Sequence, residues 1–239
     1  MLNRYKSDIV KLLDQFCHSQ EGVMKEAASA IVDAIANGGK CFAVGSGHSH
    51  MVGEEFYSRA GGLACIQLIA PMELTVGEHP TKSTRIERIS EYAHIIIMQY
   101  KISENDIVII SSNSGRNGFS IEMAMELKRR GIKTIAFTNL EHSKTVTSRH
   151  ASGKRLFEVC DFVIDNCGCH GDAFVQIEGV RGKMGSTSSI MGMFMAQSLS
   201  LLIAEELVRR DMEVPVFLSS NVDEGDAWNK SIMEKYYNI

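Results

Sequence analysis

The sequence has few cysteines and no cluster of basic residues. Most of the six cysteines stand in apolar runs such as KCFAVG and LACIQLIA, which is typical of reduced thiols in a core and not of a disulfide framework. The basic residues are dispersed and the net charge is −4, so the stripe of Lys and Arg that nucleic-acid binding needs is missing. We expect a small-molecule or protein partner and no nucleic acid.

Long apolar runs are also missing from the N-terminus, where MLNRYKSDIVKLLDQF carries a charge every few residues. Such a segment fits neither a signal peptide nor a membrane span, so we expect a cytoplasmic protein with no membrane partner. No internal repeat or low-complexity linker is present, and 44% of the residues are hydrophobic. We therefore expect residues 1–239 to form a single domain with one sizeable core.

A metal-binding pattern is nearly absent as well. Cys167, Cys169 and His170 stand together in NCGCHGD, but a zinc site needs a fourth ligand and better spacing than C-x-C-H offers. An ordinary polar loop is the favoured interpretation, and we expect no metal and no cofactor.

What the sequence does contain is an alternation of helical and strand patterns. Apolar residues recur at helical spacing from Ile9 to Phe16 and from Val23 to Ile35, which predicts two helices ending at Asn37-Gly38-Gly39. Short apolar runs then follow, typical of buried parallel strands, at residues 40–45, 63–70, 106–112, 133–138 and 161–165.

Amphipathic segments of helical length lie between these runs, at residues 48–60, 84–99 and 117–130. Alternating strands and helices predict a doubly wound, three-layer α/β/α sandwich with a five-stranded parallel, flavodoxin-like sheet. We assign 1–38 to a helical extension, 40–210 to the core and 211–239 to a tail with a helix capped near Asp226. The Met- and Leu-rich stretch 186–210 is predicted to be one long helix, largely buried and partly between subunits.

Two of the predicted strands run into turns rich in glycine and hydroxyl residues. GSGHSH (45–50) follows the first strand and SSNSGRN (111–117) follows the third. Backbone N–H groups and hydroxyls at such turns form a cradle for an anion at the carboxyl edge of the sheet. GSGHSH lacks the third glycine of a dinucleotide fingerprint and no GK[ST] follows either turn, so nucleotide binding is disfavoured.

SNSGRN resembles the S-x-S-G-x-[ST/N] phosphate loop of the SIS (sugar isomerase) domain family, and GSGHS resembles that family's first glycine turn. The resemblance covers roughly residues 20–210 and is strongest to small single-domain members related to phosphoheptose isomerases. It implies a phosphosugar-binding fold, a homodimer or homotetramer, and phosphate or another anion as the ligand of these turns. We expect the ligand-binding residues to be Ser46, His48, Ser49, Ser112, Asn113, Ser114, Arg116 and Asn117.

The catalytic positions depart from the family pattern. Phosphoheptose isomerases move protons with a glutamate on the helix after the first turn and a histidine on the last helix, and ungapped matching puts Arg59 and Gln197 there. Isomerisation through an enediol still needs a base and a proton shuttle. Glu55 shares a helix face with Arg59 and lies closer to the anion turn, so it is our candidate base; Glu54, about 100° around the helix, is the alternative.

Histidines in loops at the carboxyl edge are candidates for the acid. His79 and His170 are the two that we select, and Glu78 is a further carboxylate there. The resemblance and these residues together indicate an aldose–ketose isomerase of phosphorylated or sulfonated sugars. A phosphosugar lyase or etherase uses similar groups, and a non-catalytic sugar-phosphate sensor needs only the anion site, so both alternatives stay open.

Overall fold

The five apolar runs form one parallel sheet in the computed structural model, which describes residues 1–79, 81–221 and 225–237. The strands are β1 (Cys41–Gly45), β2 (Ile66–Ile69), β3 (Ile107–Ser111), β4 (Lys133–Thr138) and β5 (Phe162–Asp165). Their order is β2-β1-β3-β4-β5, and all neighbours pair in parallel. Every residue of β1 and β3 is buried, which explains their unbroken apolar sequences.

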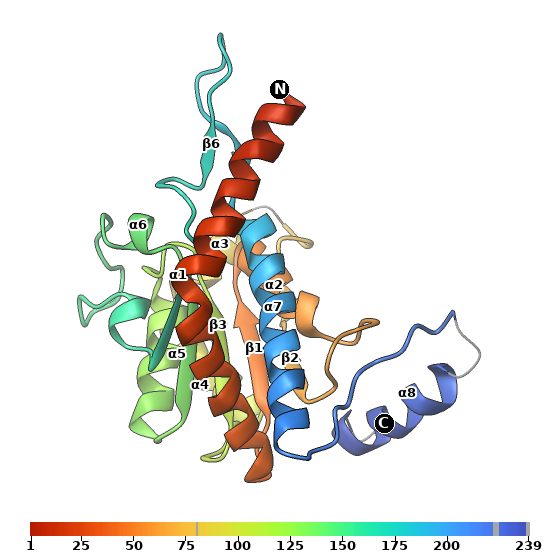
Figure 1. The fold of residues 1–239 in the computed structure, drawn as a ribbon. Helices are drawn as coiled ribbons and strands as arrows, with labels where there is room; N and C mark the ends of the chain where they lie inside the picture. The colour runs from red at the N-terminus through yellow and green to blue at the C-terminus, as the bar shows by residue number, and fades with distance from the viewer. Residues whose placement is uncertain (80, 222–224, 238–239) are drawn as a thin grey trace.

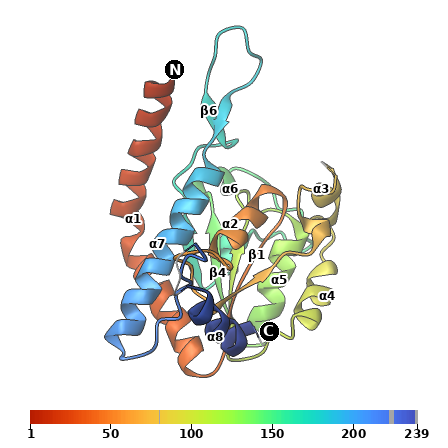
Figure 2. The same ribbon diagram turned by 90° about the vertical axis from the view of Figure 1, so that its right-hand side faces the viewer.

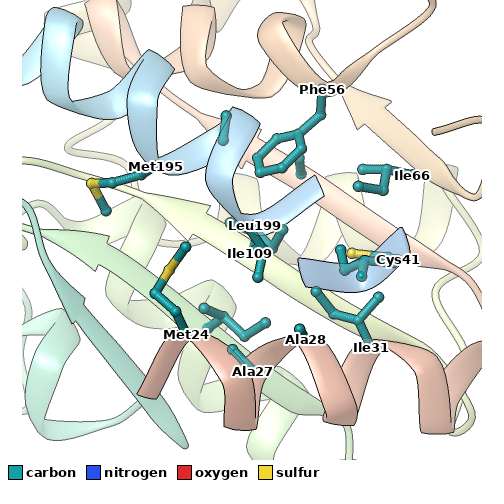
Figure 3. Close-up of a cluster of buried hydrophobic side chains, with 14 of the residues drawn as sticks. Met24, Ala27, Ala28, Ile31, Cys41, Phe56, Ile66, Ile109, Met195 and Leu199 are labelled. Atoms are coloured by element: carbon teal, nitrogen blue, oxygen red, sulfur yellow. The ribbon is translucent and has the colours of Figure 1, made fainter. Parts of the chain in front are cut away.

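Helices cover both faces of the sheet, as Figures 1 and 2 show. One face packs against α1 (Leu2–Ala36), α2 (His50–Phe56) and α7 (Ser188–Arg209), and the other against α4 (Tyr92–Gln99) and α5 (Gly118–Arg129). Figure 3 shows the first of these interfaces, where Met24 of α1 and Leu199 of α7 approach Ile109 of β3. The predicted three-layer sandwich is confirmed.

The N-terminal segment is one helix of 35 residues, α1, so the prediction of two helices was wrong. Gly22 lies where the pattern is interrupted, but a glycine inside a helix costs only about 1 kcal/mol. Packing outweighs that cost because α1 runs along α7 and buries Met24, Ala27 and Ile31 against the sheet.

Two other predicted helices are shorter than expected. The segment 48–60 begins as the 3-10 turn η1 (Gly47–Ser49) and continues as α2, which ends at Phe56 because Tyr57 is extended and Ser58 has a φ of 47°. The segment 84–99 is divided into α3 (Lys82–Ile86) and α4. The break is stabilised from outside, since the N–H of Phe119 in α5 donates to the carbonyl of Glu87 (3.0 Å).

The predicted long helix near residues 186–210 is α7. It has the length and apolar composition of a membrane-crossing helix, but it packs against α1 and α2 within the fold. Eight of its residues are buried, while Leu201 and Val208 are about two thirds exposed, at 68% and 67%. The apolar surface of α7 is therefore only partly covered within one chain.

Two elements lie outside the sandwich. The hairpin β6 (Ala173–Val175) and β7 (Met184–Ser186), which the sequence did not predict, projects beside the N-terminal end of α1, where Tyr5 lies against Phe174. In the tail, α8 (Gly225–Tyr237) begins one residue before Asp226, and its Trp228 donates to the carbonyl of Val216 (2.7 Å). The residues just before α8, 222–224, lie outside the described residues.

Candidate functional site

A narrow cleft opens at the carboxyl edge of the sheet, on the side covered by α2 and α7. The strand order changes direction between β1 and β3, so the turns that follow these strands diverge and leave room between them, as in other open parallel sheets. The lining residues come from the β1 turn and α2, from the ends of β3, β4 and β5, and from the start of α7: His48, Ser49, Val52, Ser111, Asn113, Phe137, Asn166, Ser188, Ser189, Gly192 and Met195.

The turn after β1 delivers two of the predicted ligand residues to the cleft. A Cβ on Gly45 would lie 2.3 Å from the carbonyl oxygen of Ser49, so only glycine lets η1 fold back onto the strand. This close packing places His48 and Ser49 in the cleft wall. His50 points inward instead, with its ring bound to the carbonyl of Gly47 and 3.3 Å from Glu54.

The turn after β3 presents free donors. Gly115 has a φ of 56°, and a Cβ there would lie 3.0 Å from Ser143 Oγ, so this position requires glycine. Within the described residues, the N–H groups of Ser114 and Arg116 and the hydroxyls of Ser49, Ser112 and Ser114 have no hydrogen-bond partner. These groups are available to an anion.

A relay of three amides orients Asn113. His142 N–H donates to Asn139 Oδ1 (2.7 Å), so Asn139 Nδ2 donates to Asn166 Oδ1 (3.0 Å). Asn166 Nδ2 must then donate to Asn113 Oδ1 (2.8 Å). The remaining group of Asn113, its NH₂, is left to donate towards the cleft, which suits an anionic ligand.

Asn139 and Asn166 were missed in the sequence. A signal existed, because each follows a buried strand directly, in KTIAFTN and DFVIDN, at the same edge as the two glycine turns.

Asp172, from the loop before β6, binds the N-terminal end of α7. Its carboxylate accepts from the N–H of Ser188 (2.7 Å), the hydroxyl of Ser188 (2.8 Å) and the hydroxyl of Ser186 (2.7 Å). Burial raises the pKa of Asp172, but the hydrogen bonds from Ser186, Ser188 and Thr187 outweigh it and hold that pKa below its usual value. Asp172 therefore fixes the part of α7 that lines the cleft.

On the other side of the two turns, Ser46 donates to Glu87 Oε2 (2.6 Å). Burial raises the pKa of Glu87 above its usual value, and Ser46, Arg149, Asn117 and Arg88 offset this only in part. Glu87 thus contacts the first turn through Ser46 and the start of α5 through its main chain. No motif marks Glu87 in the sequence, where it is one of several acids after the second strand.

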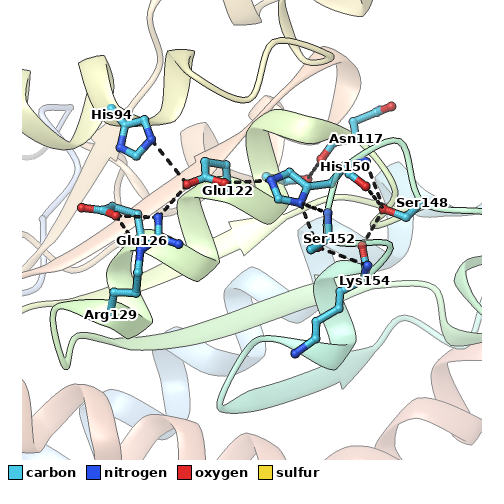
Figure 4. Close-up of polar contacts among 10 residues, drawn as sticks. His94, Asn117, Glu122, Glu126, Arg129, Ser148, His150, Ser152 and Lys154 are labelled. Atoms are coloured by element: carbon cyan, nitrogen blue, oxygen red, sulfur yellow. Dashed lines mark hydrogen bonds and ion pairs between the residues drawn. The ribbon is translucent and has the colours of Figure 1, made fainter.

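Arg149 reaches the second turn from a loop held against α5. Its Nη1 donates to Asn117 Oδ1 (2.9 Å). The next residue, His150, contacts Glu122 Oε2 of α5 (2.8 Å), as Figure 4 shows. Arg129 donates to both Glu122 (2.7 Å) and Glu126 (2.6 Å). The charges of these carboxylates are therefore balanced by protein groups, and the network anchors the loop.

The predicted catalytic residues are placed in three different surroundings. Glu55 does not line the cleft, and its carboxylate accepts hydrogen bonds from Arg59 and from Gln197 Nε2 (2.7 Å). The ring of His79 accepts from the N–H of Thr81 (3.2 Å), and neighbouring Glu78 pairs with Lys82 (2.6 Å).

His170 has a partner that the sequence did not indicate. Its Nδ1 lies 3.2 Å from Nδ1 of His142 and 3.0 Å from the hydroxyl of Thr145. Burial lowers the pKa of His142, and the charges of His170 and Arg116 lower it further. The pair lies next to the second glycine turn, because Asn139, which accepts from the N–H of His142 (2.7 Å), donates its own N–H to the carbonyl of Asn113 (3.0 Å).

Comparison with known proteins agrees with this fold and identifies the family. The chain is 43% identical to a UPF0309 protein of Halalkalibacterium halodurans (95% of this chain, 93% of the relative) and 37% identical to one of Caldanaerobacter subterraneus subsp. tengcongensis (99% and 97%). Among solved structures, it superposes on a phosphoheptose isomerase from Francisella tularensis (TM-score 0.56, 17% identity, 85% of this chain, 96% of that one). A phosphoheptose isomerase from Neisseria gonorrhoeae gives a TM-score of 0.57 at 14% identity (85% and 97%).

These structural likenesses show the fold, while the family rests on sequence. The SIS domain model matches residues 4–139, which include β1, β3, both glycine turns and α5. The chain belongs to the SIS domain family.

Proposed function

We propose that this protein is an aldose–ketose isomerase of small sugars that carry a phosphate or another tetrahedral anion, such as a sulfonate. The observation that carries the proposal is the convergence of free donors at the edge where β1 and β3 diverge. Ser49, Ser114, the loop amides and the NH₂ of Asn113 all belong to this edge. Together they match the donor set that binds a phosphate group.

The chemistry requires one group that removes the proton beside the carbonyl and another that moves a hydroxyl proton. Two carboxylates are candidates for the first role. Glu55 is the one predicted from the sequence, but it is paired with Arg59. Glu87 is half-buried, contacts the first glycine turn through Ser46 (2.6 Å) and, among the described residues, has no such ion pair. Burial raises its pKa, and these features make it the better base.

The second role falls to the His170–His142 pair. Their Nδ1 atoms lie 3.2 Å apart, close enough for a proton to pass from one imidazole to the other. The reaction moves protons only, so it needs no redox cofactor. We further propose a cytoplasmic homo-oligomer, in line with the exposed apolar residues of α7.

Proton NMR in D₂O tests this function against a panel of aldose and ketose phosphates and sulfonates. Deuterium uptake at the carbon beside the carbonyl, with conversion of aldose to ketose, is the expected result. Binding without uptake would contradict isomerisation and favour a sugar-phosphate sensor. Loss of a substituent from the sugar would identify a lyase or etherase instead.

A further inference from the structure

We infer that the α5 side of the second glycine turn is a second anion site, built by Arg88, Arg116 and Arg149. We call these three residues the arginine cluster. None of the three arginines is among the residues that line the cleft, where Asn113 and Ser49 lie. It deepens the proposed function, because a sugar with two anionic groups fits both sites.

Hydrogen bonds bring two members of the arginine cluster together. The N–H of Arg149 donates to the carbonyl of Arg116 (2.8 Å), and the Arg149 guanidinium donates to Asn117 Oδ1 (2.9 Å). Arg116 Nη2 donates to the hydroxyl of Thr147 (3.1 Å). Both guanidiniums are thus oriented by neutral acceptors and keep their full positive charge.

The charges of the cluster are not balanced by the protein. In the described part of the chain none of the three arginines has a carboxylate within 4.0 Å, whereas Arg129, Arg155 and Arg210 each have at least one. Arg116 Nε is buried and has no hydrogen-bond partner there. An unpaired buried donor on a cation costs free energy that an anionic ligand would recover.

Arg88 lies against the start of α5, since a Cβ on Gly118 would be 2.9 Å from the carbonyl oxygen of Arg88. The three guanidiniums also act on one another. Burial lowers the pKa of Arg149, and the charges of Arg116 and Arg88 lower it further. Such mutual repulsion in a folded protein is relieved when an anion binds between the cations, and guanidiniums bind phosphate or carboxylate with paired hydrogen bonds.

Among the described residues, Glu87 is the acidic group whose charge acts on Arg149, and it does not balance the three arginines. One of its oxygens accepts from Ser46, and burial raises its pKa, so at most one negative charge opposes three positive ones. Glu87 should therefore weaken anion binding at the cluster. Removing its charge should strengthen binding, whereas removing the charge of an arginine should weaken it.

Calorimetric titration of the full chain with inorganic phosphate tests the inference. Two binding events are expected, one in the cleft and one at the cluster. Arg149→Gln or Arg88→Gln should weaken the cluster event about tenfold, as expected for loss of a charged hydrogen-bonding group. Glu87→Gln should strengthen the same event about threefold or more, because it removes the opposing charge.

Matched variants separate the two sites. Arg85→Gln, an exposed arginine of nearby α3, should leave both events unchanged, and Ser49→Ala, in the wall of the cleft, should weaken the cleft event alone. A single binding event, or a cluster event that Arg149→Gln and Arg88→Gln both leave intact, would overturn the inference. Phosphate binding needs no turnover. The titration therefore tests the cluster even if the protein proves not to be an isomerase.

The anion at the cluster could be a second group of the same sugar or a separate molecule. Fructose 6-phosphate and fructose 1,6-bisphosphate are the probes that distinguish these two sources. If both groups belong to one molecule, the bisphosphate binds about tenfold more tightly or better, at one per chain, and Arg149→Gln removes the difference. If the second anion is a separate molecule, fructose 6-phosphate and inorganic phosphate bind the same chain together. Either outcome requires the cluster.

Discussion

Gln197 of α7 donates a hydrogen bond of 2.7 Å to the carboxylate of Glu55 on α2, a residue 142 positions away in the chain. The same carboxylate accepts from Arg59. Arg59 and Gln197 are the two positions that ungapped matching assigns to the glutamate and histidine of phosphoheptose isomerases. The residues that the sequence singled out by different arguments therefore meet at one polar contact between the helices that line the cleft.

This contact predicts how stability responds to a charge at position 197. Gln197→Glu places a second carboxylate against Glu55, and two like charges at this distance cannot both be ionised without a penalty. We expect the free energy of unfolding to fall by about 2 kcal/mol at pH 7. The penalty should shrink as the pH falls below about 5, because protonation of either carboxyl restores a hydrogen bond.

Gln197→Met is the matched control for this effect. It removes the hydrogen bond without adding a charge, so it should lower the free energy of unfolding by about 1 kcal/mol at both pH values. Urea denaturation at about pH 7 and about pH 4, on either side of carboxyl titration, measures both variants. Equal, pH-independent losses in the two variants would contradict the contact.

The amide relay gives a second prediction. Asn166→Asp keeps an acceptor for Asn139 Nδ2 but loses the donor to Asn113 Oδ1 (2.8 Å), so Asn113 can turn its oxygen to the cleft, beside a new negative charge. Inorganic phosphate should bind the cleft about tenfold more weakly or worse. Asn105→Asp adds the same charge at an exposed position and should not change the affinity. An unaltered affinity in Asn166→Asp would show that Asn113 does not contact the anion.

The hydroxyls of the second turn give a third prediction. Ser114→Ala should weaken the binding of a phosphorylated sugar by about 1 to 3 kcal/mol, the usual cost of leaving a charged group unpaired. Its thermal stability should not change, because Ser114 Oγ has no partner among the described residues. Ser7→Ala, exposed on α1, is the control. Parent-like binding by calorimetry would place the anion elsewhere.

The sheet could be predicted from the sequence because each strand carries its own signal. β1 and β3 are buried along their whole length, so a continuous apolar run identifies them without knowledge of their neighbours. The two glycine turns could also be predicted from local sequence. Gly45 is required by its close approach to Ser49, four residues on, and Gly115 by its positive φ.

The rest of the site depends on contacts between distant segments. Ser46 and Glu87 are 41 positions apart, and Asn113 and Asn166 are 53 apart, so no spacing rule connects them. The helix phase that selected Glu55 assumed a helix through Arg59, whereas α2 ends at Phe56. Tertiary packing determines where α2 ends, and local helix propensity does not predict that position.

A fourth prediction concerns assembly. Leu201 of α7 is 68% exposed, and it borders an apolar groove with Phe16 and Met24 of α1. We expect a homodimer or homotetramer that buries α1 and α7 between subunits. Light scattering at micromolar concentration should give a multiple of 26.4 kDa, and Leu201→Glu should lower the mass without loss of helical circular dichroism. A monomeric parent protein would contradict this.

The last prediction assigns the base. Glu87→Gln keeps the shape of the side chain and an acceptor for Ser46 (2.6 Å) but removes the oxygen that takes a proton, so deuterium uptake should fall by about 10² to 10⁴ while the protein still binds its ligand. Because burial raises the pKa of Glu87 and a base must be ionised to act, the parent's rate should rise with pH through that raised pKa, above the usual range of a glutamate. Glu91→Gln, an exposed neighbour, serves as the control for the substitution itself. Glu55→Gln is the rival variant: loss of uptake there, with uptake retained in Glu87→Gln, would return the role to the carboxylate that the sequence predicted.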